Sequence, residues 1–252
     1  MARYGMVIDL RKCVGCGACA IACKTENNTS DRAAGQTFNW ADFVFTVEGT
    51  FPDVRAVTMP VLCNHCSNAA CVEVCPVTPK AMFKTPDGLT MHNDERCIGC
   101  RMCQEACPYS AMDVEEDGAP YSVISFNESA EIQHARFGSA VEAVAGGTGS
   151  GAEVARLAGA TPPYRTDYEH PDYENVRREN IVEKCIFCAH RLVEDELPYC
   201  VESCPASARI FGDLDDPNSP PSQALAEHEA FRYKEEAGTE PNVYYIRSFK
   251  AD

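Results

Sequence analysis

Residues 97–108 read Cys97-Ile-Gly-Cys100-Arg-Met-Cys103-Gln-Glu-Ala-Cys107-Pro108, and the rest of the chain is best interpreted from this stretch. Its spacing, C-x2-C-x2-C-x3-C-P, is one with which thiolates hold iron–sulfur clusters. Three cysteines in a short loop can reach three iron corners of one cluster, while the fourth, on the following helical turn, points toward a neighbouring cluster. The proline after it cannot continue the helix, so it turns the chain away from the site.

The same pattern occurs three more times in altered form, and together the copies use every cysteine of the chain. The first copy has Lys24 where the proline would stand, the second has four residues between its middle cysteines, and the fourth has eleven. Four motifs of four cysteines account for all 16. Because neighbours so close in sequence cannot all pair with distant partners, metal ligation is favoured over a disulfide framework, and the spacing suits a tetrahedral zinc site poorly. We therefore predict four [4Fe–4S] clusters.

The ligand sets follow from a rule of two-cluster ferredoxins, in which each motif gives three ligands to one cluster and its last cysteine to the other. The second and third motifs are close in sequence and should form one such pair, and the first and fourth should form the other. The predicted sets are Cys13, Cys16, Cys19 with Cys204; Cys185, Cys188, Cys200 with Cys23; Cys63, Cys66, Cys71 with Cys107; and Cys97, Cys100, Cys103 with Cys75.

The composition excludes several classes of function. The formal net charge is −16 and the isoelectric point is near 4.8, which argues against nucleic-acid binding because phosphate neutralisation needs Lys and Arg. No apolar run approaches the roughly 18 residues of a membrane-spanning helix. The N-terminal residues contain neither a signal-peptide apolar region nor a twin-arginine pair, so export would require a partner. No nucleophile–base pair is recognisable, and we therefore interpret the chain as a non-catalytic conductor of electrons.

The predicted fold class is α+β, with two bacterial-ferredoxin-like modules that each hold two [4Fe–4S] clusters, an inserted loop region and an extended C-terminal tail. Residues 1–57 and 181–252 form the module of the first and fourth motifs, and residues 58–116 form the other. Residues 117–180 contain no ligand and are predicted to be an insertion that faces a partner. We expect strands at residues 4–10 and 243–247, a hairpin around Asp87-Gly88, and helices at residues 152–157 and 225–234.

Several other residues have two interpretations. His65 could donate to a cluster sulfur and His190 could replace a cysteine, but packing or a surface position is favoured for both, because the cysteines already complete the motifs. The glycine-rich stretch at residues 145–151 lacks a lysine at Walker spacing, so it is interpreted as a flexible hinge rather than a phosphate loop. An aromatic group favours core packing or a flanking strand over a docking surface; its members are Phe38, Trp40, Phe43 and Phe45.

The order and spacing of the four motifs resemble the four-cluster subunit of the dimethyl-sulfoxide-reductase family of molybdenum enzymes. This resemblance implies a large partner subunit that carries a molybdenum bis-pterin, and a second partner that is either a membrane quinone-reactive subunit or a cytochrome. Some relatives replace the second cysteine of the third motif with tryptophan and hold a three-iron cluster. This chain has Cys100 at that position, which implies four cubanes.

Four stretches outside the ligands are most similar to the small subunit of respiratory arsenate reductase and the related arsenite-oxidising enzymes. They are Gly5-Met-Val-Ile-Asp-Leu10, Lys24-Thr-Glu-Asn-Asn-Thr29, Glu48-Gly-Thr-Phe-Pro-Asp-Val54 and residues 159–162. The resemblance implies a position on the periplasmic side, reached by export in a folded complex whose large subunit carries a twin-arginine signal; a cytoplasmic position is the alternative.

Other functions remain open from the sequence alone. The same role in a tetrathionate, thiosulfate or polysulfide reductase is one alternative, and a polyferredoxin subunit of a hydrogenase or formate dehydrogenase is a second. A zinc-stapled interaction module is a third. The substrate of the partner never touches this chain, so its residues do not identify that substrate.

Overall fold

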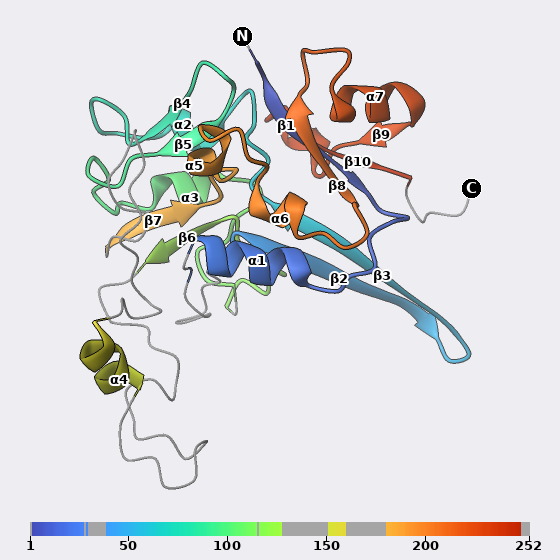
Figure 1. The fold of residues 1–252 in the computed structure, drawn as a ribbon, viewed down its shortest axis with the longest axis horizontal. Coiled ribbons are helices and arrows are strands. Elements are labelled where there is room, and N and C mark those ends of the chain that lie inside the picture. The colour runs from blue at the N-terminus through green and yellow to red at the C-terminus, as the bar shows by residue number, and fades with distance from the viewer. Residues whose placement is uncertain are drawn as a thin grey trace, which may run out of the picture.

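The computed structural model describes residues 2–27, 29, 39–114, 116–127, 151–159 and 180–247. In this part of the chain, short helices and small sheets surround one main hydrophobic core (Figure 1). Helices and strands are interspersed along the chain, and all the strand pairs of the described residues except β1 with β10 are antiparallel, which agrees with the predicted α+β class. The glycine-rich hinge predicted at residues 145–151 and Phe38 of the aromatic group fall outside the described residues, apart from Gly151.

The central sheet has the strand order β8-β1-β10-β9 and joins the two ends of the chain. β1 (Tyr4–Asp9) pairs antiparallel with β8 (Arg209–Asp213) and parallel with β10 (Val243–Ile246), which in turn pairs antiparallel with β9 (Ala230–Phe231). β1 is fully buried except for Tyr4, as expected for a central strand that is covered on both faces. The strands predicted at residues 4–10 and 243–247 are therefore present.

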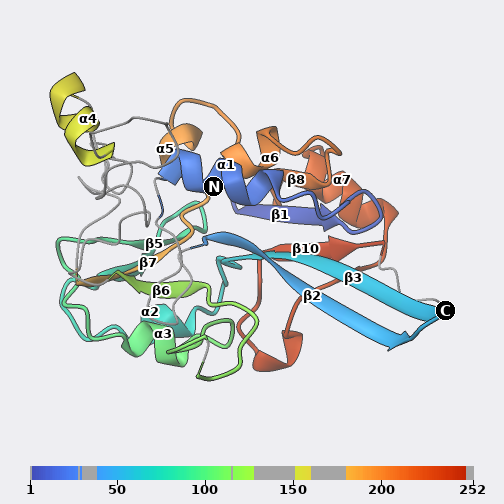
Figure 2. The ribbon, with the colours of Figure 1, turned by 90° about the horizontal axis from the view of Figure 1, so that it is seen from below.

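The longest strands of the described residues form a hairpin that the sequence pattern does not predict. β2 (Ala41–Thr50) and β3 (Asp53–Leu62) pair antiparallel along their whole length. The inner end of the hairpin is buried, whereas the outer end is exposed. In Figures 1 and 2 this outer end extends as an arm beyond the central sheet. Of the predicted aromatic group, Trp40 is buried in the core, Phe43 is half-buried and Phe45 is exposed on the arm.

Two small sheets flank the second and third motifs. β4 (Met82–Lys84) and β5 (Thr90–His92) form the hairpin predicted around Asp87-Gly88. β6 (Ile124–Asn127) pairs antiparallel with β7 (Ile181–Lys184). Ile124 and Val182 of this pair pack in one cluster with Cys71 and Cys103. The division of the chain into modules stays a prediction.

Short helices lie within or directly beside the cysteine motifs: α1 (Ala18–Asn27), α2 (Ala70–Glu73), α3 (Met102–Ala106), α5 (Ala189–Leu192) and α6 (Tyr199–Glu202). α1 packs beside α6, and α2 packs beside α3. The helix predicted at residues 152–157 is present as α4 (Gly151–Ala158). No helix in the described ranges is long and apolar enough to cross a membrane.

The helix predicted at residues 225–234 is wrong in its position. α7 spans Pro220–Glu227, β9 follows at residues 230–231, and a single 3-10 turn, η1, spans Glu235–Ala237. Ser219 caps α7, because its hydroxyl accepts a hydrogen bond from the backbone N–H of Ser222. The two prolines after it occupy the first helical turn, where no N–H partner is needed. The helix therefore begins at these prolines, before the predicted range.

Candidate iron–sulfur centres

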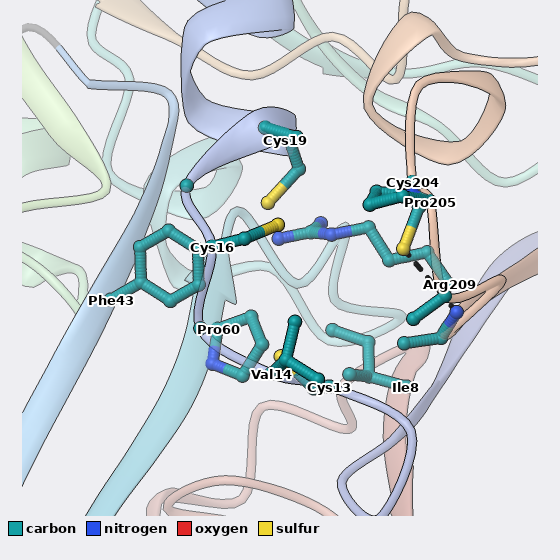
Figure 3. A pocket seen from close by; sticks show the side chains of 15 residues that line it. Ile8, Cys13, Val14, Cys16, Cys19, Phe43, Pro60, Cys204, Pro205 and Arg209 are labelled. Carbon is teal, nitrogen blue, oxygen red and sulfur yellow. Dashed lines mark hydrogen bonds between the residues drawn. The ribbon is translucent and has the colours of Figure 1, made fainter.

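Site I is a cavity lined by Cys13, Cys16, Cys19 and Cys204, which come from opposite ends of the chain. Cys13 and Cys16 lie in the loop before α1, Cys19 lies in its first turn, and Cys204 follows α6. Because α1 packs beside α6, these segments meet. Figure 3 shows the sulfurs around a common space. The four thiols thus surround a space instead of converging on one point.

Site II is a buried group of cysteines from the first and fourth motifs. Its members are Cys23, Cys185, Cys188 and Cys200, all of them buried. Burial raises the pKa of the Cys23 thiol, and the other three cysteines raise it further by charge repulsion. The Nδ2 of Asn27 lies 3.6 Å from the Sγ of Cys23 and 4.0 Å from that of Cys188. One side chain therefore contacts sulfurs from both motifs.

Sites III and IV are two further cavities built from the second and third motifs. Site III is lined by Cys63, Cys66, Cys71 and Cys107. Site IV is lined by Cys75, Cys97, Cys100 and Cys103. The packing of α2 against α3 brings Cys71 and Cys103 together at the boundary of the two sites.

The structure thus gathers the sixteen cysteines into the same four groups that the two-cluster rule gives, with the last cysteine of each motif in the site of its partner motif. That each group holds a cluster through these ligands stays a prediction.

Comparison with known proteins also indicates iron–sulfur sites in this chain. Residues 54–134 and 156–214 match the family described as "4Fe-4S dicluster domain", and residues 6–26 match "4Fe-4S binding domain". The chain is 48% identical to the arsenate respiratory reductase iron-sulfur subunit ArrB of Shewanella sp. (strain ANA-3), over 98% of this chain and 97% of that protein. The chain belongs to this family of iron–sulfur subunits.

Two further relatives are reductase components with other printed substrates. The chain is 37% identical to a putative iron-sulfur subunit of dimethyl sulfoxide reductase from Halobacterium salinarum, over 98% of this chain and 79% of that protein. It is 34% identical to a subunit of tetrathionate reductase from Salmonella typhimurium, over 97% of this chain and 72% of that protein. These findings confirm the family that the motif order predicted, and they make [4Fe–4S] clusters its cofactors.

The backbone bends in the same way between the first two cysteines of each motif. The second residue after the first cysteine of each motif has a positive φ: Gly15 (+66°), His65 (+43°), Gly99 (+67°) and Phe187 (+52°). This bend turns a backbone N–H back toward the preceding sulfur. The N–H groups of Gly99 and Phe187 lie 3.4 Å from the Sγ atoms of Cys97 and Cys185, respectively. Such donors stabilise a thiolate or a cluster sulfur and tune the reduction potential.

Glycine is the expected residue for such a bend, and it occupies the position in the first and third motifs but not in the other two. There His65 and Phe187 take the conformation instead. Their rings stack on each other with centroids 3.8 Å apart and planes 11° apart. Both side chains are buried, and the Nδ1 of His65 accepts a hydrogen bond from the N–H of Thr90. His65 thus packs in the core, as favoured above.

The charge balance of the sites also fits iron. Burial and neighbouring cysteines raise the pKa of the Cys66 and Cys103 thiols to about 12. Thiolates are nevertheless required to ligate metal, so a compensating positive charge must be bound among them. An iron–sulfur cluster supplies that charge together with electron storage. Arg209 also lines site I, and its Nη2 has no hydrogen-bond partner in the described part of the chain. An iron–sulfur cluster in site I would supply an acceptor for this buried donor.

His190 does not belong to any of the four groups. Its Nε2 lies 2.6 Å from the Oε1 of Glu26 on α1, and burial lowers the pKa of its imidazole. The neighbouring Arg191 also pairs with Glu26, at 3.4 Å. The two side chains therefore tie α5 to α1 next to site II, which is the structural position favoured for His190 from the sequence.

Proposed function

We propose that this chain is the electron-transfer subunit of a respiratory arsenate reductase and relays electrons to a molybdenum bis-pterin subunit where arsenate becomes arsenite. The observation that carries the proposal is the 48% identity to an arsenate respiratory reductase subunit along almost the whole of both chains. Delivery in the opposite direction, for arsenite oxidation, uses the same conduit. The related subunits of dimethyl sulfoxide reductase and tetrathionate reductase are less similar to this chain. Reduction of one of those substrates by the partner subunit is therefore the alternative.

The contacts between the groups support a single route with the order I, II, III, IV. Sites I and II share α1, which carries Cys19 and Cys23. Sites II and III are neighbours, as the effect of Cys63 in site III on Cys185 in site II indicates. Burial raises the pKa of the Cys185 thiol most, and the charge of Cys63 is the next largest influence. Sites III and IV meet at α3, which carries Cys103 of site IV and ends beside Cys107 of site III.

The two ends of this route are also its most accessible points. Cys16 of site I and Cys100 of site IV are exposed, whereas every cysteine of site II is buried. Electrons therefore enter and leave at sites I and IV. One end meets the molybdenum subunit, and the other meets a quinone-reactive membrane subunit or a cytochrome. We place the complex on the periplasmic side; a cytoplasmic complex is the alternative, which fractionation of cells distinguishes.

The test is anaerobic purification of the complex with its large subunit. We expect molybdenum, about sixteen iron and sixteen sulfide per copy of this chain, and reduction of arsenate by a reduced dye. Activity with tetrathionate, thiosulfate or polysulfide but not with arsenate or arsenite would move the chain to the alternative reductases. Nickel without molybdenum would make it a polyferredoxin subunit, and zinc without sulfide would end the cluster assignment.

A further inference from the structure

Two buried cations lie between consecutive cluster sites. Arg209, the first residue of β8, is 4% exposed, and Lys184, the last residue of β7, is 1% exposed. Neither motif spacing nor periodicity marks these residues, because both stand in short strands of otherwise ordinary sequence. Their positions become visible only when the four sites are assembled.

Arg209 reaches from site I to site II. Its side chain lines the cavity of site I, which Cys19 also lines. Figure 3 shows it extending from beside Cys204 toward Cys19. Its Nη1 lies 3.9 Å from the Sγ of Cys200, which belongs to site II. Its Nη2 has no partner among the residues that the structure describes.

Lys184 makes the corresponding connection between sites II and III. Its side chain lines the cavity of site III. Its Nζ donates to the backbone carbonyl of Cys185, at 2.6 Å, and Cys185 belongs to site II. A second hydrogen bond goes to the carbonyl of Thr90. Site II therefore has Arg209 near the sulfur of Cys200 and Lys184 at the carbonyl of Cys185.

Neither cation pairs with a carboxylate in the part of the chain that the structure describes. A buried charge without a counter-ion is strongly destabilising, so an anion must be bound close by. A [4Fe–4S] cluster with four thiolates is such an anion, with roughly two negative charges when oxidised and one more when reduced. Because the reduced form is the more negative, an adjacent fixed cation stabilises it and raises the reduction potential.

We propose that Arg209 and Lys184 are the counter-ions of the cluster sites they bridge, and that they raise the reduction potentials of sites I, II and III, with the largest effect at site II. This inference rests on the proposed role as an electron conduit and adds a function for two residues that are not ligands. Site II is the most deeply buried site, and burial alone disfavours an additional electron there. The two cations keep it accessible to electrons that pass along the row.

The test is a redox titration of the purified complex without substrate, in which electron paramagnetic resonance follows each cluster. Signals are first assigned by the change that each shows when one ligand of its site is replaced by serine. We expect Arg209→Met to shift sites I and II, and Lys184→Met to shift sites II and III, to more negative potentials. At a fixed potential the ratio of reduced to oxidised cluster should fall at least about threefold, where tenfold corresponds to 59 mV.

Two kinds of control separate charge from structure. Arg209→Lys and Lys184→Arg keep the charge, so they should shift the same sites by much less than the methionine variants do. Arg232→Met removes an arginine that stacks on Tyr244 and donates to its hydroxyl at 2.7 Å, and it should leave all four potentials unchanged. Iron and sulfide are counted in every variant, so that the potentials are compared only between fully loaded samples.

The proposal is overturned if both methionine variants are fully loaded and keep the native potentials, or if all four sites shift equally. It is also overturned if the charge-conserving variants shift as far as the methionine variants, since the geometry and not the charge would then matter. Should Arg209→Met fail to load its clusters, Lys184→Met and Arg209→Lys still decide the outcome. A complex inactive with arsenate contradicts the proposed substrate but leaves this titration unaffected.

Discussion

A residue with positive φ follows the first cysteine of every motif by two positions, and the space around it decides what can replace it. Gly99 has a φ of +67°, and a Cβ on it would lie 2.2 Å from the carbonyl oxygen of Asn180. Gly238 has the same φ, but a Cβ there would meet nothing within 4 Å. We predict that Gly238→Ala costs about 1–2 kcal/mol from backbone strain alone, whereas Gly99→Ala costs clearly more and disturbs site IV.

Anaerobic urea unfolding, followed by the visible absorbance of the clusters, compares these two glycine variants, and an iron assay reports loss from site IV. Equal losses of stability in the two variants would contradict the prediction. This residue scale is also where the sequence was informative only in part. Glycine marks the left-handed position at Gly15 and Gly99, but His65 and Phe187 hold it through their mutual stacking, which only the tertiary structure reveals.

At the scale of single elements, the β2–β3 hairpin is supported by the core at one end only. Val61 is 1% exposed and packs in the main core, whereas Val47, on the partner strand, is 69% exposed. We predict that Val61→Ala lowers the free energy of unfolding by about 1–3 kcal/mol through lost burial and a cavity. Val47→Ala, the same substitution in the same hairpin, should change it by about 0.5 kcal/mol or less. Urea unfolding of both variants measures the difference, and similar losses would show that the outer end is stabilised by something other than the core.

The elements that carry cysteines could be predicted because the ligand spacing limits the backbone conformations that are possible between two ligands. The hairpin could not, because its outer half packs against nothing in the described chain and therefore lacks a consistent alternation of apolar and polar residues. The pairing of β6 with β7 joins residues separated by more than fifty positions and has no local signal. The predicted position of α7 is wrong because prolines occur both in turns and in the first turn of a helix. Here Ser219 caps the helix, so the prolines after it belong to α7.

At the scale of the whole molecule, the clusters take the place of a large part of an ordinary core. Cysteines from all four motifs are members of the two hydrophobic clusters, and the buried cations have no carboxylate partner among the described residues. Removal of iron would leave unfilled space among protonated thiols and unpaired buried charges. We predict that the chain treated with a chelator under reducing conditions loses its near-ultraviolet circular dichroism and its cooperative unfolding transition. An apo-chain that keeps both would contradict a structural role for the clusters.

The arrangement of the sites also predicts which cysteines act as a unit, although they are far apart in sequence. Cys204 lines site I together with Cys13, while Cys23, only four residues after Cys19 on α1, lies with Cys185 in site II. Cys204→Ser should therefore alter the same resonance signal as Cys13→Ser, and Cys23→Ser the same signal as Cys185→Ser. If each motif instead held its own cluster, Cys23→Ser would alter the signal of Cys13.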